Sequence, residues 1–556
     1  MVFRSKLPQP ERPDTDVFNF VFQEGRYDYP RDRILYRVDG TNETLTLDQL
    51  EKRSRSFASA LVEQFGIKRN DVIAIHAHDS ITYPIAFFGT LAAGATISPI
   101  PVQKDVGPND IAPRLQQANA KLIISDSALS VVSKRAAERA GDIPLISLDD
   151  AGPAFDQLDQ LVAKGDPSFD GFRLRSYQDA DKHNAFIYRT SGSSGLIKSV
   201  LTPHSHWNAN LETTRLTLPP GTDPNHDTWI SSLPFAYGIN AKLNLGLNVL
   251  LGIPVVILTK PFDHTTLDLI ERHHITFLFV TPPLAAQIAK LGSISADLSS
   301  LKFLLSAGAP VHPKIRDAVQ TKLNDIPLTL EWGTTETLLI ALQIDEASSA
   351  PGSSGTLVNG MEAKVIDLQS GKELSYNQQG EIWIRSSLCR FAGYKDNDAA
   401  NQDFDSDGWF HSGDVGYLDE NSNVFIVDRL KELLRVGDGY GTHVSTGEIE
   451  AVLFDHPAVA TAVVVGIRDE DTQQEHPTAF VVLQPDYERQ ADRELAKDME
   501  NTVESLLGTF KRLSGGVFFV PRYPRVGYKI DKRALKSLVD VSQTAQQASR
   551  VIEISA

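Results

Sequence analysis

One short segment gathers side chains and glycines that suit an anionic ligand. Residues 188–199 read Tyr-Arg-Thr-Ser-Gly-Ser-Ser-Gly-Leu-Ile-Lys-Ser. Glycine lets backbone N–H groups approach a ligand, hydroxyl groups donate further hydrogen bonds, and Lys198 supplies positive charge. The spacing almost matches the P-loop, but Ile197 stands where that loop requires glycine. The segment therefore suits an anionic ligand but is not a P-loop, and by itself such a stretch is more often a plain surface turn.

Four further motifs follow along the chain. They are Trp332-Gly-Thr-Thr-Glu336, Gly408-Trp-Phe-His-Ser-Gly-Asp414, Asp428-Arg-Leu-Lys-Glu432 and, more loosely, Pro524-Arg-Val-Gly-Tyr-Lys-Ile530. In residue type, spacing and order they resemble the motifs of the adenylate-forming (AMP-binding) superfamily, and the chain looks closest to its 4-coumarate:CoA ligase-like acyl-CoA synthetases. The resemblance implies an enzyme that uses ATP to convert a small carboxylic acid into an acyl-adenylate, releasing pyrophosphate. Transfer of the acyl group to coenzyme A would follow.

The resemblance gives the motif residues roles around the nucleotide. The β- and γ-phosphates would be held by Thr190, Ser191, Gly192, Ser193, Ser194, Gly195 and Lys198. The rest of the nucleotide would be surrounded by Gly308, Ala309, Pro310, Trp332, Gly333 and Thr334. In this set Trp332 would stack on adenine, although a buried aromatic of the core is the alternative for it.

Charged residues complete the implied nucleotide site. Thr335 would bind the α-phosphate, and Glu336 would hold Mg²⁺, a cation that prefers carboxylate and phosphate oxygens. Asp414 would accept both ribose hydroxyls, and Arg429 would add a contact to the ribose. The implied cofactors are therefore ATP, Mg²⁺ and coenzyme A.

A catalytic lysine is expected near the end of the chain. A carboxylate that attacks the α-phosphorus approaches another anion, so a cation between them stabilises the transition state more than the ground state. The resemblance assigns this role to Lys529. The family has glycine directly before this lysine, whereas Tyr528 stands here and the glycine is displaced to Gly527. Lys532 is the competing assignment, because it lies in a basic run like the one that follows the family's lysine.

The resemblance places a hinge at Lys431, about which the C-terminal part would rotate between adenylation and thioester formation. Residues 435–444 form a loop about three residues longer than usual in the family, within which Gly441 matches the family's loop glycine. Since this loop serves the second half-reaction, its length bears on the thiol acceptor more than on adenylation.

An acyl pocket is expected from residues 233–240, 306–310 and 331–340, with Tyr237, Gly238, Asn240, Glu331 and Leu338 as its lining. Glu331 stands where many relatives have glycine. Its carboxylate would either narrow the pocket and need a polar partner, because burying it unpaired is costly, or point to solvent. Both alternatives remain open from the sequence.

Composition limits the class of protein. The 556 residues are 41% hydrophobic and 22% charged, as in globular proteins, and too many for one core. A net charge of −17 argues against nucleic acid or an anionic membrane as partner. Cys389 is the only cysteine, which excludes an internal disulfide or a cysteine metal site. Neither the first residues nor the last four carry a recognised address, so we expect a cytoplasmic protein without a membrane span.

Helix-period and strand-period segments alternate through the first four hundred residues, which predicts a layered α/β domain. Examples are a helix over 46–66 followed by a strand from Asp71, and a strand at 303–306. Turn clusters between short strands after residue 350 predict a β-rich subdomain. A small mobile α/β domain follows, with strands at 462–465 and 478–483 and helices near 446–455 and 493–507. We expect domains at 1–428 and 429–556.

Three functions remain open. The first is a coenzyme A ligase for a small carboxylic acid, acting as a monomer or homodimer. The second delivers the acyl group to a carrier-protein thiol or another acceptor, which the longer loop after the hinge favours. The third is an adenylate-binding protein weakened in catalysis, to which Ile197, Ser199 and Tyr528 give some support.

Overall fold

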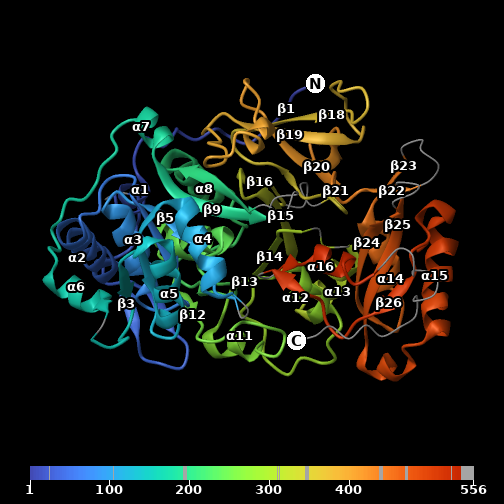
Figure 1. The fold of residues 1–556 in the computed structure, drawn as a ribbon, viewed down its shortest axis with the longest axis horizontal. Helices are drawn as coiled ribbons and strands as arrows, with labels where there is room; N and C mark the ends of the chain where they lie inside the picture. Colours follow the sequence, from blue (N-terminus) through green and yellow to red (C-terminus); the bar gives the residue numbers. More distant parts are fainter. Residues whose placement is uncertain are drawn as a thin grey trace.

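The computed structural model describes residues 1–23, 26–103, 106–153, 155–191, 197–309, 311, 313–344, 350–436, 442–469, 474–526 and 529–539. For a few of these it describes only the backbone: Ser191, Ile197, Arg435, Thr442, His443, Gln490, Val526 and Lys529. Figure 1 shows two large sheets with their helices, a smaller sheet beside them, and the C-terminal elements at one end.

The first sheet has seven strands in the order β10-β9-β5-β4-β6-β7-β8. Their bounds are β4 (Val72–His76), β5 (Thr96–Pro99), β6 (Ala120–Ser125), β7 (Leu145–Ser147), β8 (Asp156–Gln157), β9 (Asn184–Ser191) and β10 (Ile197–Pro203). Parallel pairing joins β5, β4, β6, β7 and β8, whereas β9 and β10 form an antiparallel hairpin at one edge. The short apolar runs are thus buried parallel strands, as their composition predicts.

The second sheet has nine strands in the order β17-β16-β15-β14-β13-β11-β12-β2-β3. Their bounds are β2 (Ile34–Val38), β3 (Thr44–Thr46), β11 (Trp229–Ile230), β12 (Val255–Ile257), β13 (Phe277–Phe279), β14 (Phe303–Ala307), β15 (Leu328–Thr334), β16 (Leu338–Leu342) and β17 (Thr356–Leu357). The central strands β12, β11, β13, β14 and β15 run parallel, and β16 returns antiparallel to β15.

Helices cover both sheets and bury most of their apolar faces. They are α1 (Val17–Phe22), α2 (Leu47–Phe65), α3 (Tyr83–Ala92), α4 (Pro108–Ala118), α5 (Ser130–Gly141), α6 (Leu158–Lys164), α7 (Tyr177–Lys182), α8 (His204–Leu216), α9 (Gly238–Ala241), the π-helical η1 (Lys242–Leu247), α10 (Asn248–Leu251), α11 (Asp268–His273), α12 (Pro282–Ala289) and α13 (Pro313–Lys322). In the described part of the chain, no helix combines the length and apolarity needed to cross a membrane.

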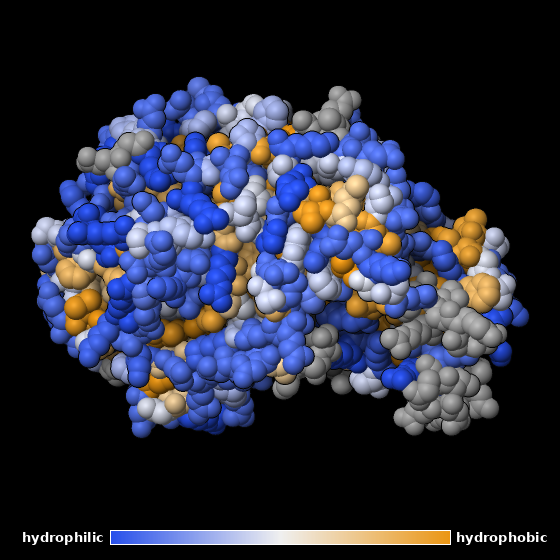
Figure 2. All heavy atoms as spheres, turned by 90° about the horizontal axis from the view of Figure 1, so that it is seen from above, coloured by the Kyte–Doolittle hydropathy of each residue, from blue (hydrophilic) through white to orange (hydrophobic). Residues whose placement is uncertain are grey.

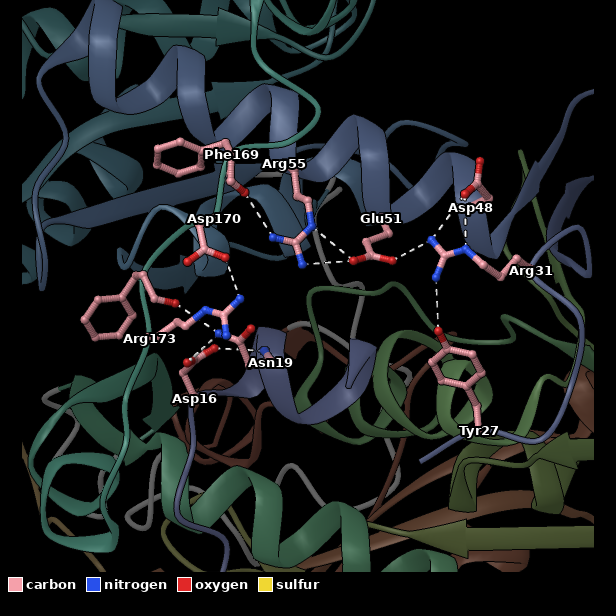
Figure 3. Close-up of polar contacts among 11 residues, drawn as sticks. Asp16, Asn19, Tyr27, Arg31, Asp48, Glu51, Arg55, Phe169, Asp170 and Arg173 are labelled. Carbon is pink, nitrogen blue, oxygen red and sulfur yellow. Dashed lines mark hydrogen bonds and ion pairs between the residues drawn. The ribbon is translucent and has the colours of Figure 1, made fainter. Parts of the chain in front are cut away.

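Capping residues determine where helix α2 begins and ends. Thr46 and Gln49 form a reciprocal capping box at its start, and Gly66 ends it in the left-handed conformation. The predicted helix over 46–66 is thereby confirmed. On its polar side, Glu51 accepts hydrogen bonds from Arg31 (2.7 Å) and Arg55 (2.9 Å), which ties the helix to the segment before β2 (Figure 3).

The third sheet joins the first residues of the chain to a segment after residue 360. Its order is β1-β18-β19-β20-β21, with β1 (Phe3–Arg4), β18 (Met361–Ile366), β19 (Gly380–Ser386), β20 (Phe410–Leu418) and β21 (Val424–Arg429). Every pairing in it is antiparallel, and Phe3 lies opposite Ala363. This sheet is the β-rich subdomain that the turn clusters predict, and the 3₁₀ helix η2 (Ala400–Asp403) packs beside it.

The C-terminal part has its own core around a three-stranded sheet. Its elements are β22 (Leu434–Val436), β23 (Thr442–Val444), α14 (Thr446–Phe454), β24 (Val459–Arg468), β25 (Glu475–Leu483), η3 (Pro485–Gln490), α15 (Arg493–Leu507), η4 (Thr509–Lys511), β26 (Val517–Phe519), β27 (Arg525–Val526), β28 (Lys529–Ile530) and α16 (Lys532–Lys536). The predicted strands and helices of this part are confirmed. The two ends of the predicted loop 435–444 are paired, because β22 runs antiparallel to β23.

Two lysines join the C-terminal part to the large sheets. Lys290 at the end of α12 donates to the carbonyl of Val459 and lies 4.2 Å from the centre of the Phe454 ring. Lys314 of α13 forms an ion pair with Asp455. The face seen in Figure 2 is mostly hydrophilic, with separate apolar patches rather than one continuous band.

Candidate active site

The predicted phosphate loop is the connection of the β9–β10 hairpin. Thr190 on β9 lies opposite Lys198 on β10, so the hairpin fixes both ends of the loop. The Lys198 ammonium forms an ion pair with Asp403 at 3.0 Å and lies 4.5 Å from the centre of the Tyr394 ring. Residues Gly192, Ser193, Ser194 and Gly195 fall outside the described residues, and of Ser191 only the backbone is described.

Glu336 lies in the turn between β15 and β16 and is 9% exposed. The Tyr394 hydroxyl donates a hydrogen bond to its Oε1 at 2.8 Å, while Oε2 accepts none within the described part of the chain. Burial and the Glu336 charge raise the pKa of Tyr394 well above its ordinary value, so the phenol stays a donor. A buried carboxylate with one uncommitted oxygen fits the ligand chemistry of Mg²⁺.

Asp414 on β20 is 3% exposed, and its carboxylate accepts hydrogen bonds from a neutral and a charged donor. Its Oδ2 accepts the indole N–H of Trp332 at 2.9 Å, and its Oδ1 accepts the Nε–H of Arg429 at 2.8 Å. The Asp414 charge raises the pKa of Arg429. The two residues are also opposite each other across the β20–β21 pair. Three predicted nucleotide residues from two sheets therefore meet at one carboxylate.

The structure agrees with the core alternative for Trp332, because its ring is buried in the large core and its N–H donates to Asp414, whereas stacking on adenine stays a prediction. The next residue must be glycine. A Cβ on Gly333 would lie 2.2 Å from the carbonyl oxygen of Leu338, where the β15–β16 pair is irregular. Leu338 itself has a φ of +57°, a left-handed conformation that costs free energy in a leucine and recurs at functional sites.

Asp79 forms hydrogen bonds within and next to the predicted acyl-pocket segment 233–240. Asp79 accepts the backbone N–H of Phe235 at 2.8 Å and the hydroxyl of Ser231 at 2.9 Å. Burial raises the pKa of the Asp79 carboxyl to about 7. Asn240 is 2% exposed and donates to the Ser231 hydroxyl and to the Leu233 carbonyl, so its amide stabilises the segment from inside. Tyr237 and Gly238, at the start of α9, are half-buried.

Glu331 forms an ion pair with Lys242, a residue that lies in none of the predicted motifs. The Lys242 ammonium donates to both of its carboxylate oxygens, at 2.9 and 3.1 Å. The two side chains are only 4% and 7% exposed. The solvent-facing alternative for Glu331 is therefore wrong, and the alternative with a polar partner holds.

Side-chain contacts are described for one of the two candidate lysines near the end of the chain. Lys532 forms ion pairs with Glu432 at 2.9 Å and Glu450 at 3.8 Å. Although burial opposes its charge, these carboxylates raise the pKa of Lys532. Lys529 lies on the two-stranded β27–β28 hairpin, and only its backbone is described. The ion pairs of Lys532 are compatible with a structural role, and the assignment of the catalytic lysine to Lys529 stays a prediction.

The remaining predicted residues lie at the edges of these clusters. Thr334 accepts the backbone N–H of Thr337 and shares a 2.9 Å hydroxyl contact with it, while Thr335 is half-buried beside them. Gly308, with a φ of +92°, and Ala309 are exposed after β14. Lys431 is exposed directly after β21. Pro310 and Gly441 fall outside the described residues.

A family model described as AMP-binding enzyme matches residues 22–395, and one described as AMP-binding enzyme C-terminal domain matches residues 448–527. The chain belongs to the AMP-binding enzyme family. The segment between the two matches contains Asp428, so a domain boundary at that residue agrees with them but stays a prediction.

Relatives of this AMP-binding enzyme include 4-coumarate–CoA ligase 3 of Oryza sativa subsp. japonica, 30% identical over 94% of this chain and 92% of the relative. Peroxisomal OPC-8:0-CoA ligase 1 of Arabidopsis thaliana is 29% identical over 86% of each chain. Among solved structures, a benzoate CoA ligase from Burkholderia xenovorans LB400 matches with a TM-score of 0.78 and 22% identity, over 94% of this chain and 99% of that one. The fold of this AMP-binding enzyme is thus the fold of that structure.

Four residues of this AMP-binding enzyme contact predicted site residues or segments but were not predicted themselves: Asp79, Lys242, Tyr394 and Asp403. Lys242 had a visible signal, because it is the single charged residue between Ala236 and Leu258, a stretch that is mostly apolar. A charge in such a stretch must be buried with a partner. The other three had none, since their roles depend on contacts with residues far away in the chain.

Proposed function

We propose that this enzyme activates a small carboxylic acid with ATP, forming an acyl-adenylate and pyrophosphate, and then transfers the acyl group to coenzyme A. The observation that carries the proposal is the meeting of Trp332, Arg429 and Asp414 beside the turn that holds Glu336. An aromatic ring, a paired carboxylate and a guanidinium form a set of groups suited to adenine, ribose hydroxyls and phosphate.

Each residue has a defined task in this proposal. Asp414 accepts the ribose hydroxyls, and Arg429 both orients that carboxylate and contacts the sugar. Lys198 exchanges its ion pair with Asp403 for the β- and γ-phosphates, and Thr335 binds the α-phosphate. Lys529 lies between the acid's carboxylate and the α-phosphate, where it offsets the repulsion of two anions as the new bond forms.

Mg²⁺ fits at Glu336, whose Oε2 accepts no hydrogen bond from the described residues while Tyr394 fixes Oε1. When bound, the ion neutralises phosphate charge and orients the leaving pyrophosphate. Tyr394 also separates this carboxylate from Lys198, because its hydroxyl contacts the first and its ring faces the second. The carboxylate and the ammonium are thereby held apart, each available to a different part of the nucleotide.

For the second step we propose coenzyme A as acceptor, with rotation about Lys431 and residues 429–556 as the moving domain. Relatives named as coenzyme A ligases over nearly the full length support this acceptor. A carrier-protein thiol is the second candidate, and the hairpin of β22 and β23 is the feature that favours it. The cytoplasm as location and a monomer or homodimer as assembly remain proposals.

Pyrophosphate release with a panel of aromatic and aliphatic acids, measured with and without coenzyme A, tests the proposal. Expected results are acid-dependent release in both conditions and an acyl-CoA product when coenzyme A is present. Adenylate that transfers only to a carrier protein would select the second candidate. No release with any acid would leave an adenylate-binding protein and overturn the proposal.

A further inference from the structure

The buried pair of Lys242 and Glu331 lies where three predicted acyl-pocket segments meet. Lys242 begins η1, directly after α9 and the Tyr237-Gly238 step. Glu331 precedes Trp332 on β15, and its register partner on β14 is Ala307, from the third segment. Paired residues of parallel strands project to the same face, so the carboxylate has a small alanine beside it. The helical turn that supplies Lys242 is a π-helix, a form that recurs at functional sites.

A contribution to folding stability does not explain why this ion pair is buried. In many proteins the free-energy cost of removing two charges from water exceeds the gain from their attraction, and apolar side chains of similar volume often stabilise the fold equally well. Here the two exposed fractions of 4% and 7% make the cost of desolvation large. One neighbour of the pair is apolar, because Leu342 lies opposite Glu331 on β16. A role in recognition explains what stability does not.

The pair keeps hydrogen-bonding capacity after its own contacts are made. The ammonium has three N–H donors, of which two meet the Glu331 oxygens within the described part of the chain. Each carboxylate oxygen accepts one bond from Lys242 and has a further lone pair. One remaining donor therefore lies beside remaining acceptors, and the net charge of the pair is zero.

We propose that Lys242 and Glu331 are the specificity-determining residues of the acyl pocket, and that the activated acid carries an uncharged group with both a donor and an acceptor, such as a hydroxyl or a primary carboxamide. The inference rests on the proposed function. The group donates to Glu331 and accepts from Lys242. An apolar acyl group displaces water there without replacing its hydrogen bonds, and a second carboxylate or an ammonium adds a net charge to a dry, neutral site.

The first test uses the unaltered enzyme with matched acids of one length, carrying a terminal hydroxyl, a methyl, a carboxylate or an amine. Acid-dependent pyrophosphate release gives kcat/KM for each acid. We expect the hydroxylated acid to exceed the methyl analogue by about 100-fold or more, as for sites built to bind a substrate hydroxyl. Equal values for these two acids overturn the inference. Release with some acids but no such preference leaves the proposed function intact, whereas no release with any acid overturns both.

The second test uses Glu331→Gln, Lys242→Met and the double variant Lys242→Met with Glu331→Leu. Glu331→Gln leaves the ammonium without its counter-charge, so preference should move toward the acid with a second carboxylate. The double variant replaces the pair by apolar side chains, so we expect it to fold even if a single variant does not. Thermal unfolding of each variant checks this. Its hydroxyl-to-methyl ratio should fall to about 1 or below. A double variant that folds and keeps the ratio of the unaltered enzyme refutes the inference.

Lys302→Met is the matched control for removing a lysine from an ion pair. Lys302 pairs with Asp227 at 2.6 Å, and the Asp227 side chain is fully buried, but neither residue belongs to the three acyl-pocket segments. Its ratio for the hydroxyl and methyl acids should equal that of the unaltered enzyme. A change of the ratio in this control as large as in Lys242→Met would assign the effect to general loosening and contradict the inference.

Discussion

Asp414→Asn tests the nucleotide site most directly, because its carboxylate faces a donor on each oxygen. One oxygen accepts the Trp332 indole N–H at 2.9 Å and the other accepts the Arg429 Nε–H at 2.8 Å. Asparagine has one oxygen and one NH₂ group, so in either orientation it turns an N–H toward one of these donors. Hydrogen bonds to charged groups contribute about 1.5–3 kcal/mol, but Arg429 is 43% exposed and solvent screens its pair. We expect the free energy of unfolding to fall by about 1–2 kcal/mol.

The effect on ATP should be larger than the effect on stability. A carboxylate accepts both ribose hydroxyls with a charged acceptor, whereas asparagine accepts from one of them at most. The loss of about 1.5–3 kcal/mol raises the KM for ATP roughly 10- to 150-fold. Initial rates of pyrophosphate release across ATP concentrations measure this KM, and thermal unfolding separates it from loss of fold.

Asp419→Asn is the matched control for this substitution. Asp419 lies in the turn between β20 and β21, where it accepts the backbone N–H of Asn423 at 2.8 Å, and it has no contact with Trp332 or Arg429 in the structure. Its KM for ATP should stay within about twofold of the unaltered enzyme, since surface substitutions change little. If Asp414→Asn is folded and has the same KM as this control, Asp414 does not bind the nucleotide.

Three further substitutions test other parts of the site. Lys529→Ala should abolish acyl-adenylate formation yet spare thioester formation from supplied adenylate; loss of adenylation in Lys532→Ala alone would reverse the assignment. Asp79→Asn tests pH dependence: the Asp79 pKa of about 7 exceeds the ordinary 3.8, so folding takes up a proton between these values and stability falls as pH rises through that window. The variant should therefore lose this fall and gain stability relative to the unaltered enzyme above pH 7, and equal pH profiles in unfolding experiments would contradict it. Gly333→Ala should cost about 1–3 kcal/mol, since its Cβ meets the Leu338 carbonyl at 2.2 Å, whereas Gly292→Ala, with open space, should not.

Local patterns in the sequence predicted several elements of the fold. The capping residues of α2 and the period of its apolar residues set that helix, and the apolar run after Asp71 became β4. Pairing between distant strands was different. Nothing in residues 1–10 indicates that Phe3 belongs beside Ala363, because two residues carry no register information.

The candidate site also contains residues that motifs predicted and a residue that they did not. Asp414, Arg429, Trp332 and Glu336 were predicted from motifs, and the structure brings the first three into contact. Lys242 was not predicted, because it lies in none of the motifs that were compared. Its partner Glu331 was recognised from the sequence, because many relatives have glycine at its position. A buried carboxylate predicts that a cation exists nearby but not which of the 54 lysines and arginines supplies it.

The pairing of β1 with β18 also bears on the order in which the protein is completed during synthesis. Phe3 and Ala363 are 360 positions apart (363 − 3), and translation proceeds at about 5–20 residues per second. Phe3, only 5% exposed in the finished protein, therefore waits roughly 20–70 s for its partner strand. By then the ribosome has released every strand of the seven-stranded sheet, so the sheet that carries Asp414 and Arg429 is the later one to close. A stalled or truncated nascent chain would hold the strands of the first sheet without the pair of Asp414 and Arg429.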